Sequence, residues 1–125
     1  MINLLDRANI YFDTFSNKDL DGLKEMFADD ITLRDWDINV VGIDDVLEAN
    51  SNIFNSVESI KVNPINIWDA STPKQKVIVA ELEIVVNDKE KILVTDILEF
   101  QYSENRIDIL EIDDYKIKSI RAYKG

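Results

Sequence analysis

Apolar residues recur at three- and four-residue spacing in the first part of the chain, which is typical of amphipathic helices. This spacing predicts three helices before residue 56. We expect Asp19 to cap the N-terminus of the second helix, and a turn at Gly42 to precede the third. The apolar residues of the three helices are Leu4, Leu5, Ala8, Tyr11, Phe12 and Phe15, then Leu20, Leu23, Met26 and Phe27, and then Val46, Leu47, Ile53 and Phe54.

From about Ser59 onward the pattern changes to short runs rich in Ile and Val, separated by turn-like breaks. Helices followed by such strands predict one α+β domain over residues 1–125, with three helices packed on one face of a strongly bent antiparallel sheet. The interior of such a cone is a natural pocket for a small molecule. The strands of this part are predicted within residues 59–70, 75–86, 91–102, 106–112 and 116–123.

An earlier strand, which begins at Ile31, carries an acid where an apolar residue is expected. Successive side chains of a strand point to opposite faces, so Asp35 follows Ile31 and Leu33 on the face that should be buried. Desolvation on such a face raises the pKa of a carboxylic acid, which makes Asp35 a candidate proton carrier. In the alternative interpretation Asp35 lies at the end of the strand, where residues 35–37 form a solvated loop.

The charge and composition narrow the classes of partner. The chain has 14 basic and 25 acidic residues, and its formal net charge is −11. A surface this negative repels phosphate groups, so nucleic acid and anionic membrane surfaces are poor candidates. No apolar run approaches the ~20 residues needed to cross a bilayer, and the N-terminal segment does not look like a signal peptide. The absence of cysteine fits a cytoplasmic protein.

The residue types that are missing restrict the chemistry. Without His and Cys, the usual acid–base shuttle, the usual zinc ligands and the thiol nucleophile are excluded. Proton transfer in an enzyme of this composition falls to Asp, Glu, Tyr or Lys. The acidic residues between positions 29 and 45 are of the type that binds Mg²⁺ or Ca²⁺, but their spacing matches no EF-hand loop. We expect them to form a solvated rim and expect neither a metal nor a cofactor.

Several segments of the chain resemble the NTF2-like superfamily, and within it the SnoaL-like and ketosteroid-isomerase-like branch. They are YFDTFSNKDLDGLKEMFADDITLRDW from Tyr11, Gly42 with the helix after it, LVTDILEF from Leu93, and KIKSIRAYKG at the C-terminus. The resemblance covers nearly the whole chain. It implies a cone made from a bent antiparallel sheet and three helices, commonly as a homodimer. Because the superfamily includes isomerases, cyclases, dehydratases and non-catalytic proteins, the fold does not decide the activity.

The resemblance to the isomerase implies roles for three residues. That enzyme holds an oxyanion with a Tyr and a protonated Asp, while a second Asp moves the proton. By position, Tyr11 matches the Tyr and Asp35 the proton-moving Asp. The remaining Asp matches Asp96 when counted from the preceding hairpin, or Asp108 when counted back from the C-terminus, so that a segment near residues 101–112 looks inserted. We favour Asp96 because it alternates with apolar residues, whereas a basic neighbour offers Asp108 a surface ion pair.

Each of these residues also has a purely structural interpretation. Tyr11 can be a core residue whose hydroxyl bonds a backbone group, and Asp96 can cap a turn or bond across strands. Two function classes therefore stay open. The first is an isomerase or cyclase that abstracts a proton next to a carbonyl in a small apolar ligand, and the second is a non-catalytic ligand-binding or dimerisation module.

Aromatic and aliphatic residues predict two further surfaces. We expect four aromatic side chains to bind the ligand as walls of the pocket. Residues 75–86 are apolar on both faces of their strand, so one face can line the cone while the other packs on a second subunit. A homodimer is therefore predicted. The four wall residues are Phe15, Trp36, Phe54 and Trp68.

Overall fold

Three helices form where the apolar spacing predicts them. The computed structural model describes residues 3–102 and 115–125, and its helices are α1 (Leu4–Ser16), α2 (Leu20–Met26) and α3 (Ile43–Ser56). The predicted cap of α2 is confirmed, because Asp19 Oδ1 accepts a hydrogen bond from the Gly22 N–H at 3.0 Å. Before α3 the chain turns at Gly42, whose φ of 96° is easily adopted only by glycine.

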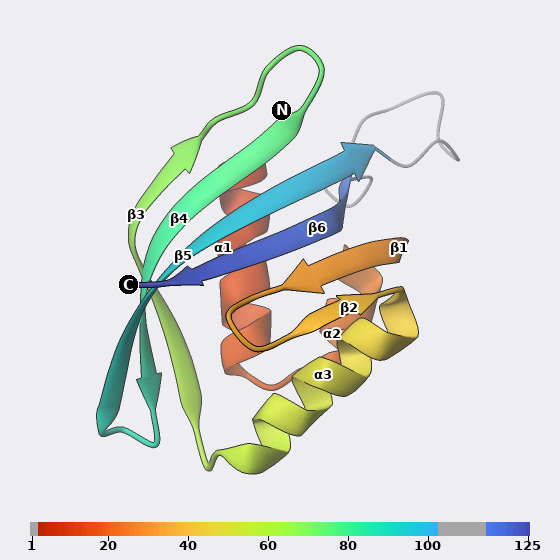
Figure 1. The fold of residues 1–125 in the computed structure, drawn as a ribbon. Coiled ribbons are helices and arrows are strands. Elements are labelled where there is room, and N and C mark those ends of the chain that lie inside the picture. Colours follow the sequence, from red (N-terminus) through yellow and green to blue (C-terminus); the bar gives the residue numbers. More distant parts are fainter. Residues whose placement is uncertain (1–2, 103–114) are drawn as a thin grey trace.

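Six strands form one sheet, which is strongly curved and carries the helices on one side (Figure 1). Their order in the sheet is β2-β1-β6-β5-β4-β3. The predicted α+β architecture of helices and a mostly antiparallel sheet is confirmed. The predicted strand over 106–112 lies outside the described residues. The strands are β1 (Phe27–Arg34), β2 (Asn39–Val41), β3 (Ile60–Asp69), β4 (Lys76–Val86), β5 (Glu90–Tyr102) and β6 (Tyr115–Lys124).

The sheet is not entirely antiparallel. β1 and β6 run parallel, with Leu33 opposite Ile120, whereas every other neighbouring pair of described strands is antiparallel. Hairpins join antiparallel neighbours, but β1 and β6 are separated by most of the chain and need no tight turn between them. Phe27, which the apolar spacing places in the second helix, instead begins β1.

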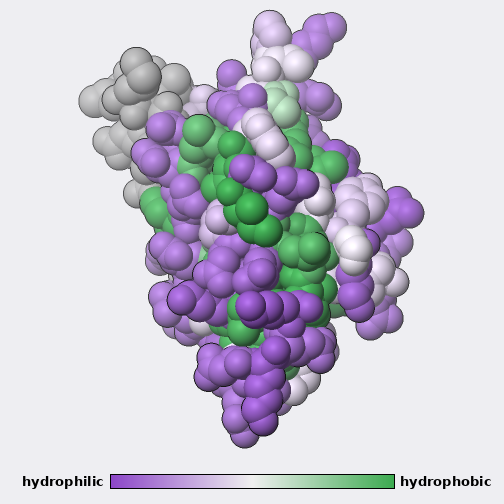
Figure 2. Space-filling model, turned by 90° about the vertical axis from the view of Figure 1, so that its left-hand side faces the viewer, coloured by the Kyte–Doolittle hydropathy of each residue, from purple (hydrophilic) through white to green (hydrophobic). Residues whose placement is uncertain are grey.

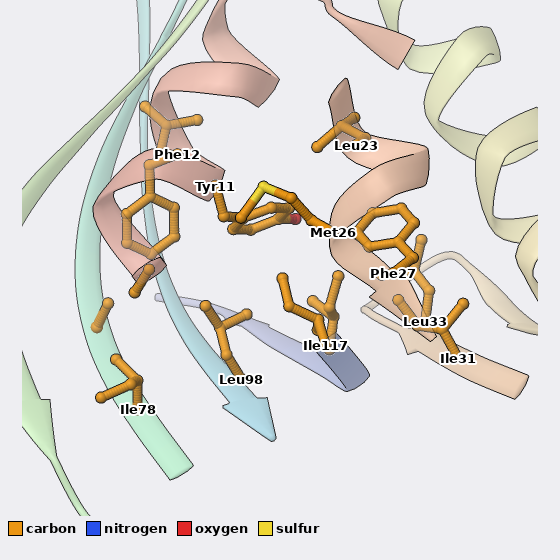
Figure 3. Packing of buried hydrophobic residues seen from close by; sticks show 14 of the residues in the cluster. Tyr11, Phe12, Leu23, Met26, Phe27, Ile31, Leu33, Ile78, Leu98 and Ile117 are labelled. Atoms are coloured by element: carbon orange, nitrogen blue, oxygen red, sulfur yellow. The ribbon is translucent and has the colours of Figure 1, made fainter. Parts of the chain in front are cut away.

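The core lies between the helices and the concave face of the sheet. In Figure 3, Tyr11 from α1 and Met26 from α2 lie above Leu98 and Ile117 of the sheet. These side chains are at most 5% exposed. Burying a large apolar side chain contributes about 1.5–3 kcal/mol, so this cluster supplies much of the stability of the domain.

Two polar side chains at the end of α1 attach it to other elements. The Ser16 hydroxyl accepts a hydrogen bond from the Val62 N–H of β3 at 2.9 Å. Lys18 Nζ donates to three carbonyl oxygens at 2.7–3.1 Å. One belongs to Phe54 in the last turn of α3, and the other two belong to Val57 and Glu58, which follow the helix. Because these carbonyls have no helical partner, the ammonium group caps the C-terminus of α3.

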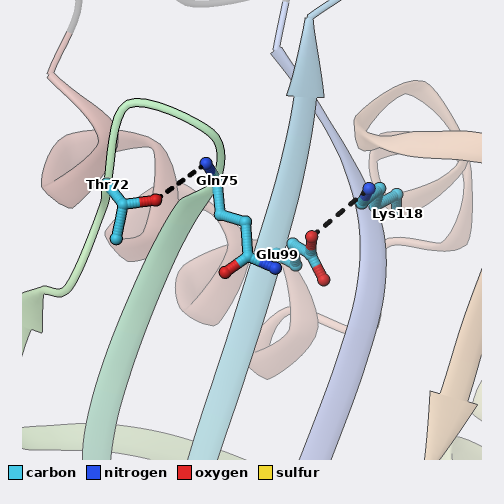
Figure 4. Close-up of polar contacts among 4 residues, drawn as sticks. All are labelled: Thr72, Gln75, Glu99 and Lys118. Carbon is cyan, nitrogen blue, oxygen red and sulfur yellow. Dashed lines mark hydrogen bonds and ion pairs between the residues drawn. The ribbon is translucent and has the colours of Figure 1, made fainter.

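The outer face of the sheet mixes apolar and charged side chains. Glu99 Oε2 of β5 and Lys118 Nζ of β6 form an ion pair at 3.3 Å, and the Thr72 hydroxyl accepts from the Gln75 N–H in the β3–β4 loop (Figure 4). Trp68 of β3, which is half-exposed, lies opposite Val79. Seen from the side where β3 edges the sheet, hydrophobic residues form a band between hydrophilic ones (Figure 2).

No described helix has the length and apolar character that a membrane crossing requires.

Candidate functional site

A cavity of about 270 Å³ opens between the concave face of the sheet and helices α1 and α3. Its walls are mainly aliphatic and aromatic. A pocket that is apolar and carries a few convergent polar groups is the usual form of a small-molecule site, and this volume is near the lower end of the ~300–1,000 Å³ range of such pockets. Its polar side chains are Tyr11, Asp35, Asp37, Asn50 and Asp96.

Asp96 enters the cavity from the centre of the sheet. On β5 it alternates with the buried Val94 and Leu98, so it shares their inward face. Its partners in the neighbouring strands are Ala80 of β4 and Ala122 of β6. Because both are small, they leave free space on each side of the carboxyl group.

The Asp96 carboxyl group is buried without a compensating partner. It is 8% exposed and makes no hydrogen bond or ion pair with the described part of the chain. Burial, with a smaller contribution from the negative charge of Asp35, raises the pKa of Asp96 from 3.8 to about 7. A carboxyl group with this pKa is present in both protonation states near neutral pH.

Tyr11 brings a hydroxyl group to the same cavity from α1. Its ring is 5% exposed and packs against the rings of Phe12, Phe15 and Phe27, with centroids 5.5–6.3 Å away. Burial, with a smaller contribution from the charge of Asp96, raises the pKa of Tyr11 well above 10.0, so the phenol is protonated and can donate. Within residues 3–102 and 115–125 its hydroxyl has no hydrogen-bond partner, so the backbone bond expected for a simple core tyrosine is not formed there.

Asp35 follows the last residue of β1 and belongs to a turn. Asp35 Oδ1 accepts hydrogen bonds from the N–H groups of Asp37 at 2.7 Å and Ile38 at 2.6 Å. The Asp35 N–H donates in turn to the Ile38 carbonyl at 2.9 Å. This local network fixes the carboxylate, and Asp35 still lines the cavity. Asp35 therefore lies at the end of the strand, as the alternative interpretation predicts, and also lines the cavity.

The four predicted wall residues separate into two pairs. Phe15 and Trp36 line the cavity, and the Lys124 ammonium lies 5.8 Å from the centre of the half-exposed Trp36 ring. Phe54 and Trp68 do not line it. Phe54 is buried and packs edge-on against Phe15, with centroids 4.9 Å apart.

The position of Trp68 results from an irregularity in β3. Ile60 and Val62 point inward, and an unbroken alternation would also point Trp68 inward. The register of β3 shifts between Pro64 and Asn66, which moves every later side chain to the other face. Trp68 therefore lies on the outer face of the sheet, half-exposed.

Asn50 is a polar residue of the cavity that sequence reasoning missed. It lies on α3 one turn after Val46 and one turn before Phe54, both buried, and is itself 3% exposed. A polar residue on the apolar stripe of a helix is a signal that the sequence contains. Asp108, the alternative to Asp96, lies outside the described residues.

The described residues hold no group of three or more Asp or Glu side chains arranged to bind a metal ion. What the cavity offers is a hydroxyl donor, three carboxyl groups and an amide.

Comparisons with known proteins give the fold. The sequence matches no family model and no curated protein. The structure is similar to nuclear transport factor 2 from Cryptosporidium parvum, with a TM-score of 0.79 and 10% identity over 96% of this chain and 90% of that one. It is also similar to a proposed dehydratase of the NTF2-like family from Streptomyces avermitilis, with a TM-score of 0.77 and 14% identity over 94% and 90% of the two chains. A third match is a proposed isomerase of the SnoaL-like family from Agrobacterium tumefaciens, with a TM-score of 0.69 and 9% identity over 97% and 96%.

Identities this low show a shared fold and leave the activity open. The matches cover at least 90% of each of these three chains, so the likeness extends over the whole domain. The chain has the NTF2-like fold that the sequence predicts.

Proposed function

We propose that the protein is a cofactor-independent enzyme that moves a proton next to the carbonyl group of a small apolar compound, as an isomerase or cyclase does. Asp35 takes the proton, and Tyr11 and Asp96 donate hydrogen bonds to the enolate oxygen. The observation that carries the proposal is that these three side chains line one apolar cavity.

The reaction needs one carboxylate that accepts a proton and two protonated groups that donate hydrogen bonds. The Asp35 carboxylate accepts the proton from the carbon beside the carbonyl. The electron pair of that C–H bond forms the C=C bond of the enolate, and the π pair of the carbonyl moves to its oxygen. Tyr11 and neutral Asp96 stabilise the oxygen as its charge develops. Asp35 then returns the proton, either to the same carbon or to another one of the enolate.

The proposed reaction needs Asp96 in its neutral form and Asp35 in its ionised form. Because the pKa of Asp96 is raised to about 7, its neutral form persists to higher pH than that of an ordinary carboxylic acid. The proton-transfer rate is therefore expected to fall above about pH 7, when Asp96 ionises and can no longer donate.

Hydrogen–deuterium exchange tests the proposal without knowledge of the natural substrate. The probe is 2-tetralone, a bicyclic ketone with acidic protons beside its carbonyl, followed by proton NMR in D2O. We expect exchange faster than in buffer, and its loss in Asp35→Asn, which keeps the shape of the side chain but cannot take a proton. Removal of a general base typically costs about 10²–10⁴-fold.

Asp30→Asn is the matched control, because Asp30 is an exposed acid of β1, the strand that Asp35 directly follows, and does not line the cavity. This variant should exchange like the unmodified protein. If 2-tetralone binds but Asp35→Asn and the unmodified protein exchange it equally, catalysis by Asp35 is refuted, and the protein is better described as a non-catalytic ligand-binding module.

We also propose that the protein forms a homodimer through the outer face of the sheet. Trp68, Val79, Ile97 and Arg121 lie side by side across four neighbouring strands on this face. At about 25 cal/mol per Å² of buried apolar area, covering such a row favours association.

A further inference from the structure

The amide of Asn50 is buried in the cavity wall without a partner. Asn50 is 3% exposed, and its Nδ2 atom has no hydrogen-bond acceptor within the described chain. Ile53 of α3 and Val57, which follows the helix, also line the cavity and are aliphatic. Asn50 is thus a single polar group in an apolar part of the wall.

An unpaired buried amide is unfavourable in the empty protein. Leaving such a group without a hydrogen bond costs about 1–3 kcal/mol, and a leucine at this position would avoid the cost. A bound molecule that brings an acceptor oxygen to Nδ2 would remove the penalty. Asn50 lines the same cavity as Tyr11 and Asp96, so a molecule bound there is the natural source of such an oxygen.

We infer that Asn50 selects ligands with a second oxygen atom, distinct from the carbonyl that reacts. The ligand class is an apolar, one- or two-ring carbonyl compound that carries a further hydroxyl, ether or carbonyl group. This inference rests on the proposed function for the site, and it adds the second oxygen as a requirement for tight binding. Asn50 does not take part in the proton transfer and acts as a specificity-determining residue.

Naphthols provide the probes, because 2-naphthol has the ring frame and oxygen position of the enol of 2-tetralone. The affinity of 2-naphthol is compared with those of its hydroxy- and methoxy-substituted derivatives, with the second oxygen placed at each ring position in turn. Binding is followed by naphthol fluorescence. We expect at least one derivative to bind about 5–10-fold more tightly than 2-naphthol, the gain of one net hydrogen bond.

Two variants assign that gain to Asn50. Asn50→Leu should abolish the preference for the second oxygen, while its affinity for 2-naphthol stays similar. Asn52→Leu changes an exposed asparagine of the same helix and should keep the preference. Asn50→Leu should also raise the melting temperature of the empty protein, since it removes an unpaired amide.

The outcomes separate this inference from the proposed function. If Asn50→Leu keeps the full preference, or if no derivative binds more tightly than 2-naphthol, the inference is overturned while the proton-transfer proposal stands. A lower melting temperature of Asn50→Leu would also count against it, because the amide would then have a partner in the empty protein. If the preference is present but 2-tetralone exchange is not catalysed, the inference holds and the proposed reaction fails.

Discussion

Two acids of β5, three residues apart, have opposite surroundings. Asp96 points into the cavity, is 8% exposed, and has no hydrogen-bond or ion-pair partner in the described chain. Glu99 points to the outer face, where Lys118 neutralises it at 3.3 Å (Figure 4). The strand is the same, and the difference comes only from which face each side chain occupies.

This contrast indicates where chemistry is located in the sheet. The charge of the acid on the outer face is balanced by its partner, and pairs near the solvent contribute little to stability. An unpaired acid inside the cone, with a pKa raised to about 7, is still partly protonated near neutral pH and can donate a hydrogen bond to a ligand. The predictions below address the two acids and the two faces.

The largest expected effect is on the inner face. Tyr11→Phe removes the hydroxyl while keeping the ring that packs against Phe12, Phe15 and Phe27. Loss of one oxyanion donor costs about 10²-fold or more in rate. We expect that loss in 2-tetralone exchange, measured by NMR, with little change in the melting temperature. Unchanged exchange would show that Tyr11 is only a core residue.

The second effect is a pH-dependent change of stability in Asp96→Asn. Because the pKa of Asp96 is raised to about 7 in the folded protein, from 3.8, the folded state holds the proton more tightly than the unfolded chain does. Its contribution to the free energy of unfolding is therefore full below about pH 4 and is lost as the pH rises to about 7.

Asn cannot ionise, so its stability does not fall in this way. When the pH rises from 4 to 8, the free energy of unfolding of Asp96→Asn should increase by roughly 2–4 kcal/mol relative to that of the unmodified protein, at about 1.36 kcal/mol per pKa unit. Urea unfolding at the two pH values measures this difference. A relative stability that does not change with pH would mean that Asp96 has an ordinary pKa.

The third prediction concerns the outer face. Light scattering at micromolar concentration should give twice the chain mass of 14.4 kDa. Trp68→Lys replaces the aromatic side chain of the row Trp68, Val79, Ile97 and Arg121 by a charge and should weaken the dimer by about tenfold or more, as expected when a central interface aromatic is lost. Thr72→Lys, in the exposed β3–β4 loop, should leave the dimer intact. A mass of 14.4 kDa for the unmodified protein would refute the dimer.

The smallest effect is expected from Glu99→Gln, the outer-face counterpart of Asp96→Asn. Lys118 is 42% exposed in its side chain, so this ion pair is largely screened by solvent. Its loss should change the free energy of unfolding by no more than about 1 kcal/mol, and less at high salt. A loss as large as the gain expected for Asp96→Asn would remove the distinction between the two faces.

The sequence predicts the fold and the inward position of Asp96 because both depend on local periodicity. Tyr11 lies on the apolar stripe of a helix, and Asp96 alternates with buried aliphatic residues. The outward position of Trp68 was not predictable in this way, because it depends on a bulge near Pro64 that no periodic pattern shows. Asn50 was missed because a single polar residue on an apolar helix face becomes informative only when the cavity beside it is known.

The most direct test of the account is a carbon-13 NMR titration of the Asp96 carboxyl group. The proposed role of Asp96 requires a carboxyl group that is buried, unpaired and close to the Asp35 charge. It predicts a titration midpoint near pH 7, and a lower midpoint in Asp35→Asn because the neighbouring negative charge is removed. A midpoint close to 3.8, the ordinary value for Asp, would contradict the account, because Asp96 would then be fully ionised at neutral pH and could not donate to an enolate.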